Sequence, residues 1–121
     1  MQKRKRGKYN NKIIKTKDGK FDSKKEYSVW LKLKRQQELG KIKNLQRQVP
    51  FVLIPTQYEM IGTKKYIVER ECKYIADFVW IDCQSGENIV ADCKGGIMTP
   101  EFIIKRKLML YKFGIKIKII E

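Results

Sequence analysis

The chain has 121 residues, with 28 Lys and Arg, 13 Asp and Glu and no His, so its formal net charge is +15. This length predicts one domain with a single modest core and excludes a two-domain architecture. The absence of histidine excludes His-based acid/base catalysis, Ser-His-Asp and Cys-His triads, and zinc sites with histidine ligands. Any catalysis must therefore use carboxylates, Lys, Tyr, Cys or a metal ion.

The N-terminal segment, residues 1–12, is polar and basic, and we expect a flexible arm ahead of a single domain over 13–121. It lacks the apolar stretch of a secretory signal, and no apolar run approaches the ~20 residues of a membrane span. The three cysteines, Cys72, Cys83 and Cys93, show no CxxC spacing. We therefore expect a cytoplasmic protein with free thiols, no membrane association and no zinc.

The first strong element is a helix from near Ser23 to Gly40, preceded by a short strand and turn. Ser23 and Glu26 form a Ser-x-x-Glu capping-box pattern, and a glycine such as Gly40 commonly follows a helix C-terminus. Glu26 shares a helix face with Trp30 and Leu33. For Glu26, a surface capping role alone stays open beside a role in a site.

Strand-like segments follow the helix. Residues 45–54 contain Pro50, which is typical of an edge or bent strand. Residues 66–72 and 73–82 form one long strand or two. A turn at 84–87 then joins the second segment to a returning strand at 88–94, which predicts a hairpin.

The last elements are a second helix and a final strand. Thr99 followed by Pro100 predicts the start of a helix that runs to about Phe113 and stops at Gly114. Residues 115–120 form the final strand. The order α-β-β-β-α-β predicts an α/β fold in which helices flank a mixed β-sheet.

Basic segments surround an acidic middle. Residues 51–92 carry four Lys or Arg and seven acids, whereas each flanking segment has an excess of Lys and Arg. A basic surface attracts a polyanion through phosphate contacts and counterion release, which indicates a nucleic-acid partner. A solvated surface or a ribosome-like binder accounts for the charge alone equally well. An acidic pocket accepts a phosphate only when a cation lies between them.

Three charged residues of the predicted hairpin carry the chemistry. Asp77 lies in the middle of an apolar strand, where a carboxylate is costly to bury without a cation or hydrogen-bond donors. Asp92 and Lys94, two residues apart on the returning strand, share a face. If the hairpin turns near 84–87, Asp77 comes close to Asp92. Two carboxylates then flank a gap that suits Mg²⁺ or Mn²⁺, and Lys94 can position water and offset developing charge.

These residues also carry a resemblance to a known group of enzymes. Ala76-Asp77 followed by Asp92-Cys93-Lys94 resembles the signature of the PD-(D/E)xK nucleases, with Ala76 in place of the proline and Asp92 in the place more often filled by Glu. The wider pattern resembles a small phage-encoded endonuclease branch, similar to Holliday-junction resolvases and transposon-end nucleases. The blocks that carry it are Phe21-Asp22-Ser23-Lys24-Lys25-Glu26, Leu45-Gln46-Arg47-Gln48-Val49, Tyr74-Ile75-Ala76-Asp77-Phe78-Val79, Asp92-Cys93-Lys94-Gly95, Thr99 and Ile104-Lys105-Arg106-Lys107-Leu108.

The resemblance implies a restriction-endonuclease-like core and assigns roles to single residues. Asp77, Asp92 and the backbone carbonyl of Cys93 would bind Mg²⁺ or Mn²⁺, with Glu26 as a further ligand or water-orienting acid. Lys94 would be the catalytic lysine. For Asp77 the alternative is a buried ion pair with Lys94, and for Asp92 and Lys94 it is a solvent-facing strand pair.

Further residues are expected to contact nucleic acid. Gln48 would orient a water or phosphate, although an ordinary polar role in a strand fits equally well. For the two helix lysines the alternative is a solvated helix face, and for the N-terminal arm it is a solubilising tail. The expected nucleic-acid contacts are Lys3, Arg4, Lys5, Arg6, Lys8, Gln48, Lys105 and Lys107.

The residues and the resemblance together predict an Mg²⁺-dependent endonuclease that hydrolyses DNA. The resemblance further implies that cleavage leaves a 5′-phosphate and 3′-hydroxyl and serves phage DNA recombination or processing. A small core has little surface for base readout, so branched or Holliday-junction DNA is the expected substrate. A symmetric junction calls for a homodimer with two sites. The alternatives are a non-catalytic DNA-binding protein or phage regulator on a nuclease-like fold, and an RNA-binding or ribosome-associated protein.

Overall fold

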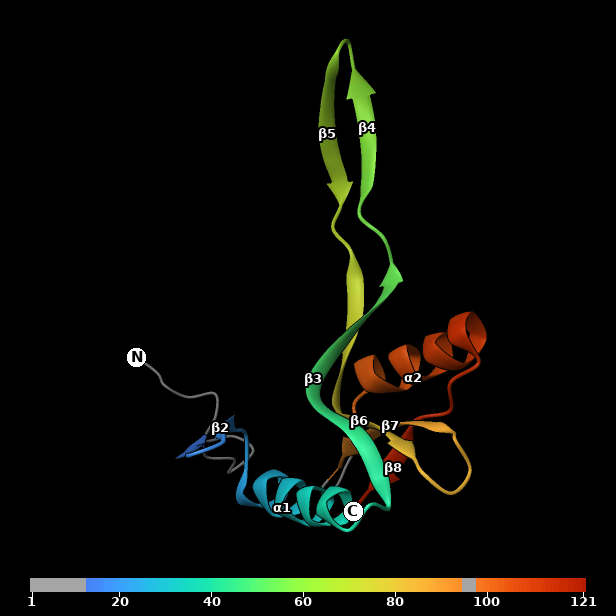
Figure 1. Cartoon of the computed structure of the whole chain (residues 1–121). Helices are drawn as coiled ribbons and strands as arrows, with labels where there is room; N and C mark the ends of the chain where they lie inside the picture. The colour runs from blue at the N-terminus through green and yellow to red at the C-terminus, as the bar shows by residue number, and fades with distance from the viewer. Residues whose placement is uncertain (1–12, 95–97) are drawn as a thin grey trace.

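A four-stranded mixed sheet with two helices forms the body of the protein. The computed structural model describes residues 13–94 and 98–121. The sheet has the strand order β3 (Ile42–Ile54), β6 (Cys72–Asp82), β7 (Asn88–Cys93), β8 (Lys118–Ile120), as seen in Figure 1. The first two neighbouring pairs are antiparallel, and β7 and β8 are parallel.

The helices are α1 (Lys24–Glu38) and α2 (Pro100–Phe113). Together with the sheet strands they follow the chain order α1-β3-β6-β7-α2-β8, so the predicted order and the mixed α/β class are confirmed. The helix α2 forms the crossover that the parallel pair β7 and β8 requires. In the described part of the chain, no helix is long and apolar enough to span a membrane.

The two helices pack on opposite faces of the sheet. Val90 belongs to a buried cluster with Phe102 and Met109 of α2. The next residue, Ala91, belongs to a second cluster, against which Trp30 of α1 packs. Because successive strand residues point to opposite faces, each helix covers one side of the sheet. Ala76 belongs to the first of these clusters and Phe78 to the second. Asp77, which stands between them on β6, therefore lies where the two clusters meet.

Side-chain caps fix both helix starts as predicted. The Ser23 hydroxyl accepts a hydrogen bond from the Glu26 N–H at 3.1 Å, and the Thr99 hydroxyl accepts one from the Phe102 N–H at 3.1 Å. The second helix ends at Gly114, which has the positive φ of 68° that glycine adopts without strain. The capping box at α1 is only half formed, because the Glu26 carboxylate accepts from the Asp22 N–H instead of the Ser23 N–H.

Two short strands lead into the first helix, and the last strand is shorter than predicted. β1 (Ile14–Thr16) pairs with β2 (Gly19–Phe21) in a tight hairpin. The edge position expected for the Pro50-containing strand is confirmed, because β3 lies at the edge of the sheet. The final strand covers only Lys118–Ile120 of the predicted 115–120.

A two-stranded arm is present that the sequence patterns did not predict. β4 (Gln57–Ile61) pairs with β5 (Lys64–Glu69) around Gly62, and the pair projects well beyond the body, as Figure 1 shows. The segments left open as one strand or two are therefore two, β5 in the arm and β6 in the sheet. Pro55 indicates a strand end, and the side chains of both arm strands are all exposed. A strand that buries nothing lacks the alternation by which strands are recognised.

Candidate functional site

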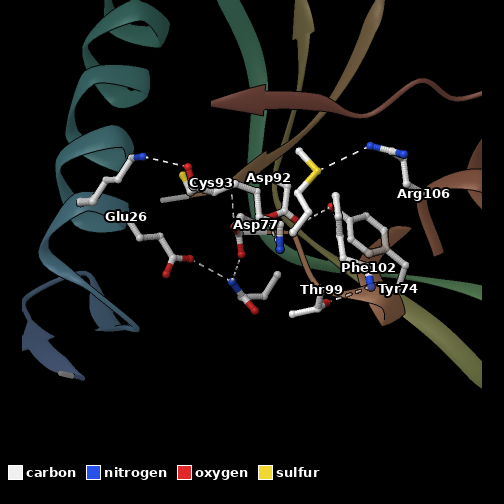
Figure 2. A network of polar contacts seen from close by, with 12 residues as sticks. Glu26, Tyr74, Asp77, Asp92, Cys93, Thr99, Phe102 and Arg106 are labelled. Atoms are coloured by element: carbon white, nitrogen blue, oxygen red, sulfur yellow. Dashed lines mark hydrogen bonds and ion pairs between the residues drawn. The ribbon is translucent and has the colours of Figure 1, made fainter. Parts of the chain in front are cut away.

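The two aspartates lie where the hairpin ladder ends. Regular pairing of β6 with β7 stops at Phe78 and Ala91, and Asp77 and Asp92 occupy the next opposed positions in that register. The Asp77 carboxylate accepts a hydrogen bond from the Cys93 N–H at 2.9 Å, as Figure 2 shows. The predicted proximity of Asp77 and Asp92 is confirmed. Both carboxylates therefore lie just beyond the last regular pair of the β6–β7 ladder.

Gln48 joins the first helix to the two central strands. Its position on β3 lies between Arg47 and Val49, the partners of Phe78 and Ala76, and therefore opposite Asp77. Its side-chain amide donates to Glu26 Oε2 at 3.2 Å and, more weakly, to Asp77 Oδ1 at 3.4 Å.

The backbone of Gln48 is left-handed, with φ of 53°. This conformation is uncommon for a residue other than glycine and costs about 1–3 kcal/mol at a strained position. The Gln48 amide contacts two carboxylates of the cluster, and its expected role in orienting a water or phosphate stays a prediction beside that of an ordinary polar strand residue.

Glu26 is buried in the first turn of α1 and is only 4% exposed. Burial raises the pKa of its carboxyl group, and the N–H of Asp22, which donates to Oε1 at 3.2 Å, partly opposes this. The alternative of a surface capping residue is wrong. The structure connects Glu26 to Asp77 through the shared amide of Gln48.

Asp92 is also buried, at 5% exposure, and has two partners. The Tyr74 hydroxyl donates to its Oδ2 at 2.7 Å, and the Lys94 ammonium lies 3.5 Å from its Oδ1. The same ammonium lies 4.0 Å from the centre of the Phe102 ring. The solvent-facing pair and the Asp77–Lys94 ion pair are therefore both wrong, because Lys94 pairs with a buried Asp92.

The cluster has an excess of negative charge that shows in its pKa values. Burial, followed by the charge of Asp92, raises the pKa of Asp77 to about 7, and the Cys93 N–H only partly offsets this. Burial and the neighbouring carboxylates raise the pKa of the Cys93 thiol to about 12. A thiol with so high a pKa stays protonated at neutral pH and is a poor nucleophile.

Without added metal, we expect stability to fall as pH rises, because Asp77 binds its proton more tightly in the folded state than in the unfolded state. The contribution of its proton is fully present below the unfolded pKa of 3.8 and is lost as pH rises through about 7. Asp77→Asn should remove this dependence and raise the free energy of unfolding at about pH 8 by ~1–3 kcal/mol.

Denaturant unfolding in EDTA at about pH 5 and pH 8 measures this difference, with Glu87→Gln on the exposed turn as the matched control. Equal pH slopes for wild type and Asp77→Asn would contradict the expected raised pKa of Asp77.

The site opens into a cleft of about 810 Å³. The N-terminal turns of both helices and the ends of β6 and β7 line it. Four lysines, Lys25, Lys73, Lys94 and Lys105, border it together with five acidic residues. Lys25 donates to the backbone carbonyl of Lys94 at 3.1 Å and so holds the first helix to the end of β7.

The structure divides the expected nucleic-acid contacts into three groups. Gln48 and Lys105 line the cleft, although Lys105 also pairs with Glu101 at 2.9 Å. Lys107 is exposed on α2 and does not line the cleft, and both its expected nucleic-acid contact and the solvated-face alternative stay open. The remaining residues, Lys3, Arg4, Lys5, Arg6 and Lys8, lie outside the described residues.

Sequence reasoning gave no role to two residues that shape the site, Tyr74 and Lys25. The signal for Tyr74 is its place three residues before Asp77, but the partner of its hydroxyl depends on how β6 and β7 open. Lys25 is adjacent to Glu26, and its contact with the Lys94 carbonyl depends on the docking of α1. Both interactions connect residues far apart in the sequence.

The site offers carboxylate oxygens, which are the donor type that hard divalent cations take. Over residues 13–94 and 98–121, no group of three or more His, Cys, Asp or Glu is arranged to hold a metal ion. Mg²⁺ commonly takes only one or two carboxylates and completes its shell with waters and substrate phosphates. Within the same residues neither Glu26 nor Asp77 has an ion-pair partner. Asp77 and Asp92 bring two carboxylates together, and metal ligation by these two residues, by Glu26 and by the Cys93 carbonyl stays a prediction.

Almost the whole chain matches one known protein family. A family described as "Protein of unknown function (DUF1064)" matches residues 6–120. The chain belongs to the DUF1064 family. No curated protein and no solved structure matches it. The match includes every residue of the cleft, so the site is part of the region that defines the DUF1064 family.

Proposed function

We propose that the chain is a metal-dependent DNA endonuclease of the PD-(D/E)xK type with a restriction-endonuclease-like core. The observation that carries the proposal is the convergence of Asp77 and Asp92 at the open end of a hairpin, with Lys94 ion-paired to Asp92. A pair of aspartates with only a structural role would be unfavourable in the middle of a strand, because a neighbouring negative charge makes a carboxylate harder to ionise. A divalent cation removes that cost.

In this proposal Asp77 and Asp92 hold Mg²⁺ or Mn²⁺, together with the backbone carbonyl of Cys93. The bound ion would polarise a phosphodiester oxygen and lower the pKa of a coordinated water. The hydrogen bonds from the Cys93 N–H to Asp77 and from the Tyr74 hydroxyl to Asp92 fix the two carboxylates in orientation. Hydrogen bonds to metal-binding side chains fix the orientation of those side chains and so affect metal affinity.

Lys94 and Gln48 act on the reacting groups. The Lys94 ammonium, 3.5 Å from Asp92 and against the Phe102 ring, supplies positive charge where negative charge develops on the phosphate. The Gln48 amide, held between Glu26 and Asp77, orients the attacking water. Hydrolysis would form a bond from the water oxygen to phosphorus, with loss of a proton from that water to solvent. It would break the bond to the 3′-oxygen, which takes up a proton from solvent and leaves as the 3′-hydroxyl.

The kind of contact that the cleft offers supports a substrate class. Its lysines and the N-terminal turns of both helices suit backbone phosphates, and phosphate contacts carry no sequence information. We therefore propose branched DNA, including Holliday junctions, as the substrate in phage DNA recombination or processing, with cleavage in the host cytoplasm.

The test compares cleavage of labelled four-way junction, flap and linear duplex DNA with Mg²⁺, with Mn²⁺ and with EDTA. We expect cutting that needs metal and favours branched DNA. Asp77→Asn purified in parallel shows whether the cutting belongs to a contaminating nuclease. Tight binding without cutting under every metal would overturn the proposal and leave the non-catalytic DNA-binding protein.

A further inference from the structure

The projecting arm exposes apolar side chains that nothing in the described part of the chain covers. The strands β4 and β5 form a sheet of their own, and within residues 13–94 and 98–121 each pairs only with the other. Six apolar residues along them are each 45–62% exposed. They are Tyr58, Met60, Ile61, Tyr66, Ile67 and Val68. An isolated two-stranded hairpin is marginally stable in water, so this arm calls for a partner.

The charge of the arm argues against nucleic acid as that partner. Residues 57–69 carry two lysines, Lys64 and Lys65, and two glutamates, Glu59 and Glu69, so their net charge is zero. The whole chain carries +15. A segment that bound phosphates would be expected to share the basic excess, because phosphate binding depends on Lys and Arg. The arm instead combines apolar residues with balanced charge, as protein interfaces do.

The order of the charges along β5 makes the strand complementary to itself. Lys65 lies near the tip and Glu69 near the base, with Ile67 midway between them. Two copies of β5 related by a two-fold axis run antiparallel, and the residue on the axis faces its own copy. With Ile67 on the axis, Lys65 of each copy lies opposite Glu69 of the other, and Tyr66 lies opposite Val68.

We propose that the free edge of β5 pairs with β5 of a second copy of the chain, joining the two arms into a four-stranded sheet centred on Ile67. The unpaired edge offers backbone donors and acceptors for such a ladder. Opposite charges directly across a ladder add about 0.2–1 kcal/mol each, and like charges oppose pairing by a similar amount. This register contains the Lys65–Glu69 pair twice, whereas the like charges of Lys64 and Arg70 meet only beyond Glu69, where β5 ends. The inference is independent of the proposed nuclease activity.

Sedimentation equilibrium of the full chain at ~1–100 μM tests the proposal, because standard protein interfaces are stable in this range. Wild type should form a dimer. Lys65→Glu and Glu69→Lys should each weaken it by about tenfold, since each places like charges opposite one another twice. The double variant should recover most of the lost association, because the pair is restored in the opposite sense although the contact of Lys65 with the Tyr58 ring is lost.

Two matched controls test the register. Glu59→Lys makes the same reversal as Glu69→Lys but on β4, away from the proposed edge. Lys64→Glu makes the same reversal as Lys65→Glu at a position that faces Arg70 of the second copy. Neither control should weaken the dimer, and circular dichroism confirms that each variant is folded.

Three results would overturn the proposal. The wild-type chain could be a monomer throughout the concentration range. The double variant could dissociate as readily as the single variants. The arm variants could change DNA binding while the chain stays monomeric, which would make the arm a DNA contact. None of these measurements depends on metal or cleavage, so they separate this proposal from the proposed function.

Discussion

Asp77→Asn is expected to lower the single-turnover rate of DNA cleavage by about 10³-fold or more, because it removes a negative charge that the cation needs. Asparagine has nearly the same shape, and its carbonyl oxygen can still accept the Cys93 N–H hydrogen bond found at 2.9 Å. The loss of activity should therefore occur without loss of fold. Affinity for DNA measured by fluorescence anisotropy in EDTA should stay within a few-fold of wild type, because phosphate contacts use other residues.

The matched control for this change is Asp82→Asn. Asp82 lies on the same strand, five residues further along, and bonds to Ser85 in the turn instead of lining the cleft. The Asp82→Asn variant should cleave DNA at the wild-type rate. Wild-type cleavage by Asp77→Asn would show that this carboxylate is not required and would exclude the proposed site. Equal losses in both variants would point to general destabilisation of β6.

The central hairpin and the two helices were predictable because their signals are local. Alternating apolar residues and a turn at 84–87 set the register, and this register alone brings Asp77 opposite Asp92. Ser23 and Thr99 start the helices through bonds that span three residues. Interactions of this kind depend on neighbours in the sequence, so patterns and capping preferences suffice to find them.

The surroundings of the acids were less predictable because they depend on docking between distant elements. The burial of Glu26 and its connection to Asp77 through Gln48 require α1, β3 and β6 to be in place. No propensity indicates a left-handed glutamine within a strand. Local rules are broken most often at functional sites, where a strained backbone or a buried charge is retained at a cost in stability.

The arm was missed for the opposite reason. Its residues obey no burial pattern, because both of its strands are exposed along their whole length. Its stability must come from cross-strand contacts such as Lys65 over the Tyr58 ring at 4.1 Å, and from whatever covers its apolar side chains. An alternating sequence pattern predicts which side chains are buried within one chain. It does not predict which surfaces a second molecule would bury.

Lys94→Ala should lower the cleavage rate by ~10²–10³-fold, the usual effect of removing one preorganised group that stabilises developing charge. The loss should be in the rate at saturating metal and DNA, because the Lys94 ammonium lies beside Asp92, a proposed metal ligand. Single-turnover kinetics and Mn²⁺ titration calorimetry on the same preparation measure the two quantities. Lys107→Ala, an exposed lysine on α2 outside the cleft, is the matched control.

The metal affinity of Lys94→Ala separates a catalytic lysine from a structural one. Removing a cation 3.5 Å from Asp92 makes the cluster more negative, so Mn²⁺ should bind Lys94→Ala at least as tightly as wild type. Tighter metal binding with slower cleavage is the signature of a group that acts on the reacting phosphate. If Lys94 served only to offset the charge of Asp92, a bound cation would replace it in that role. Cleavage at saturating metal would then stay at the wild-type rate, and Lys94 would have no place in the chemistry.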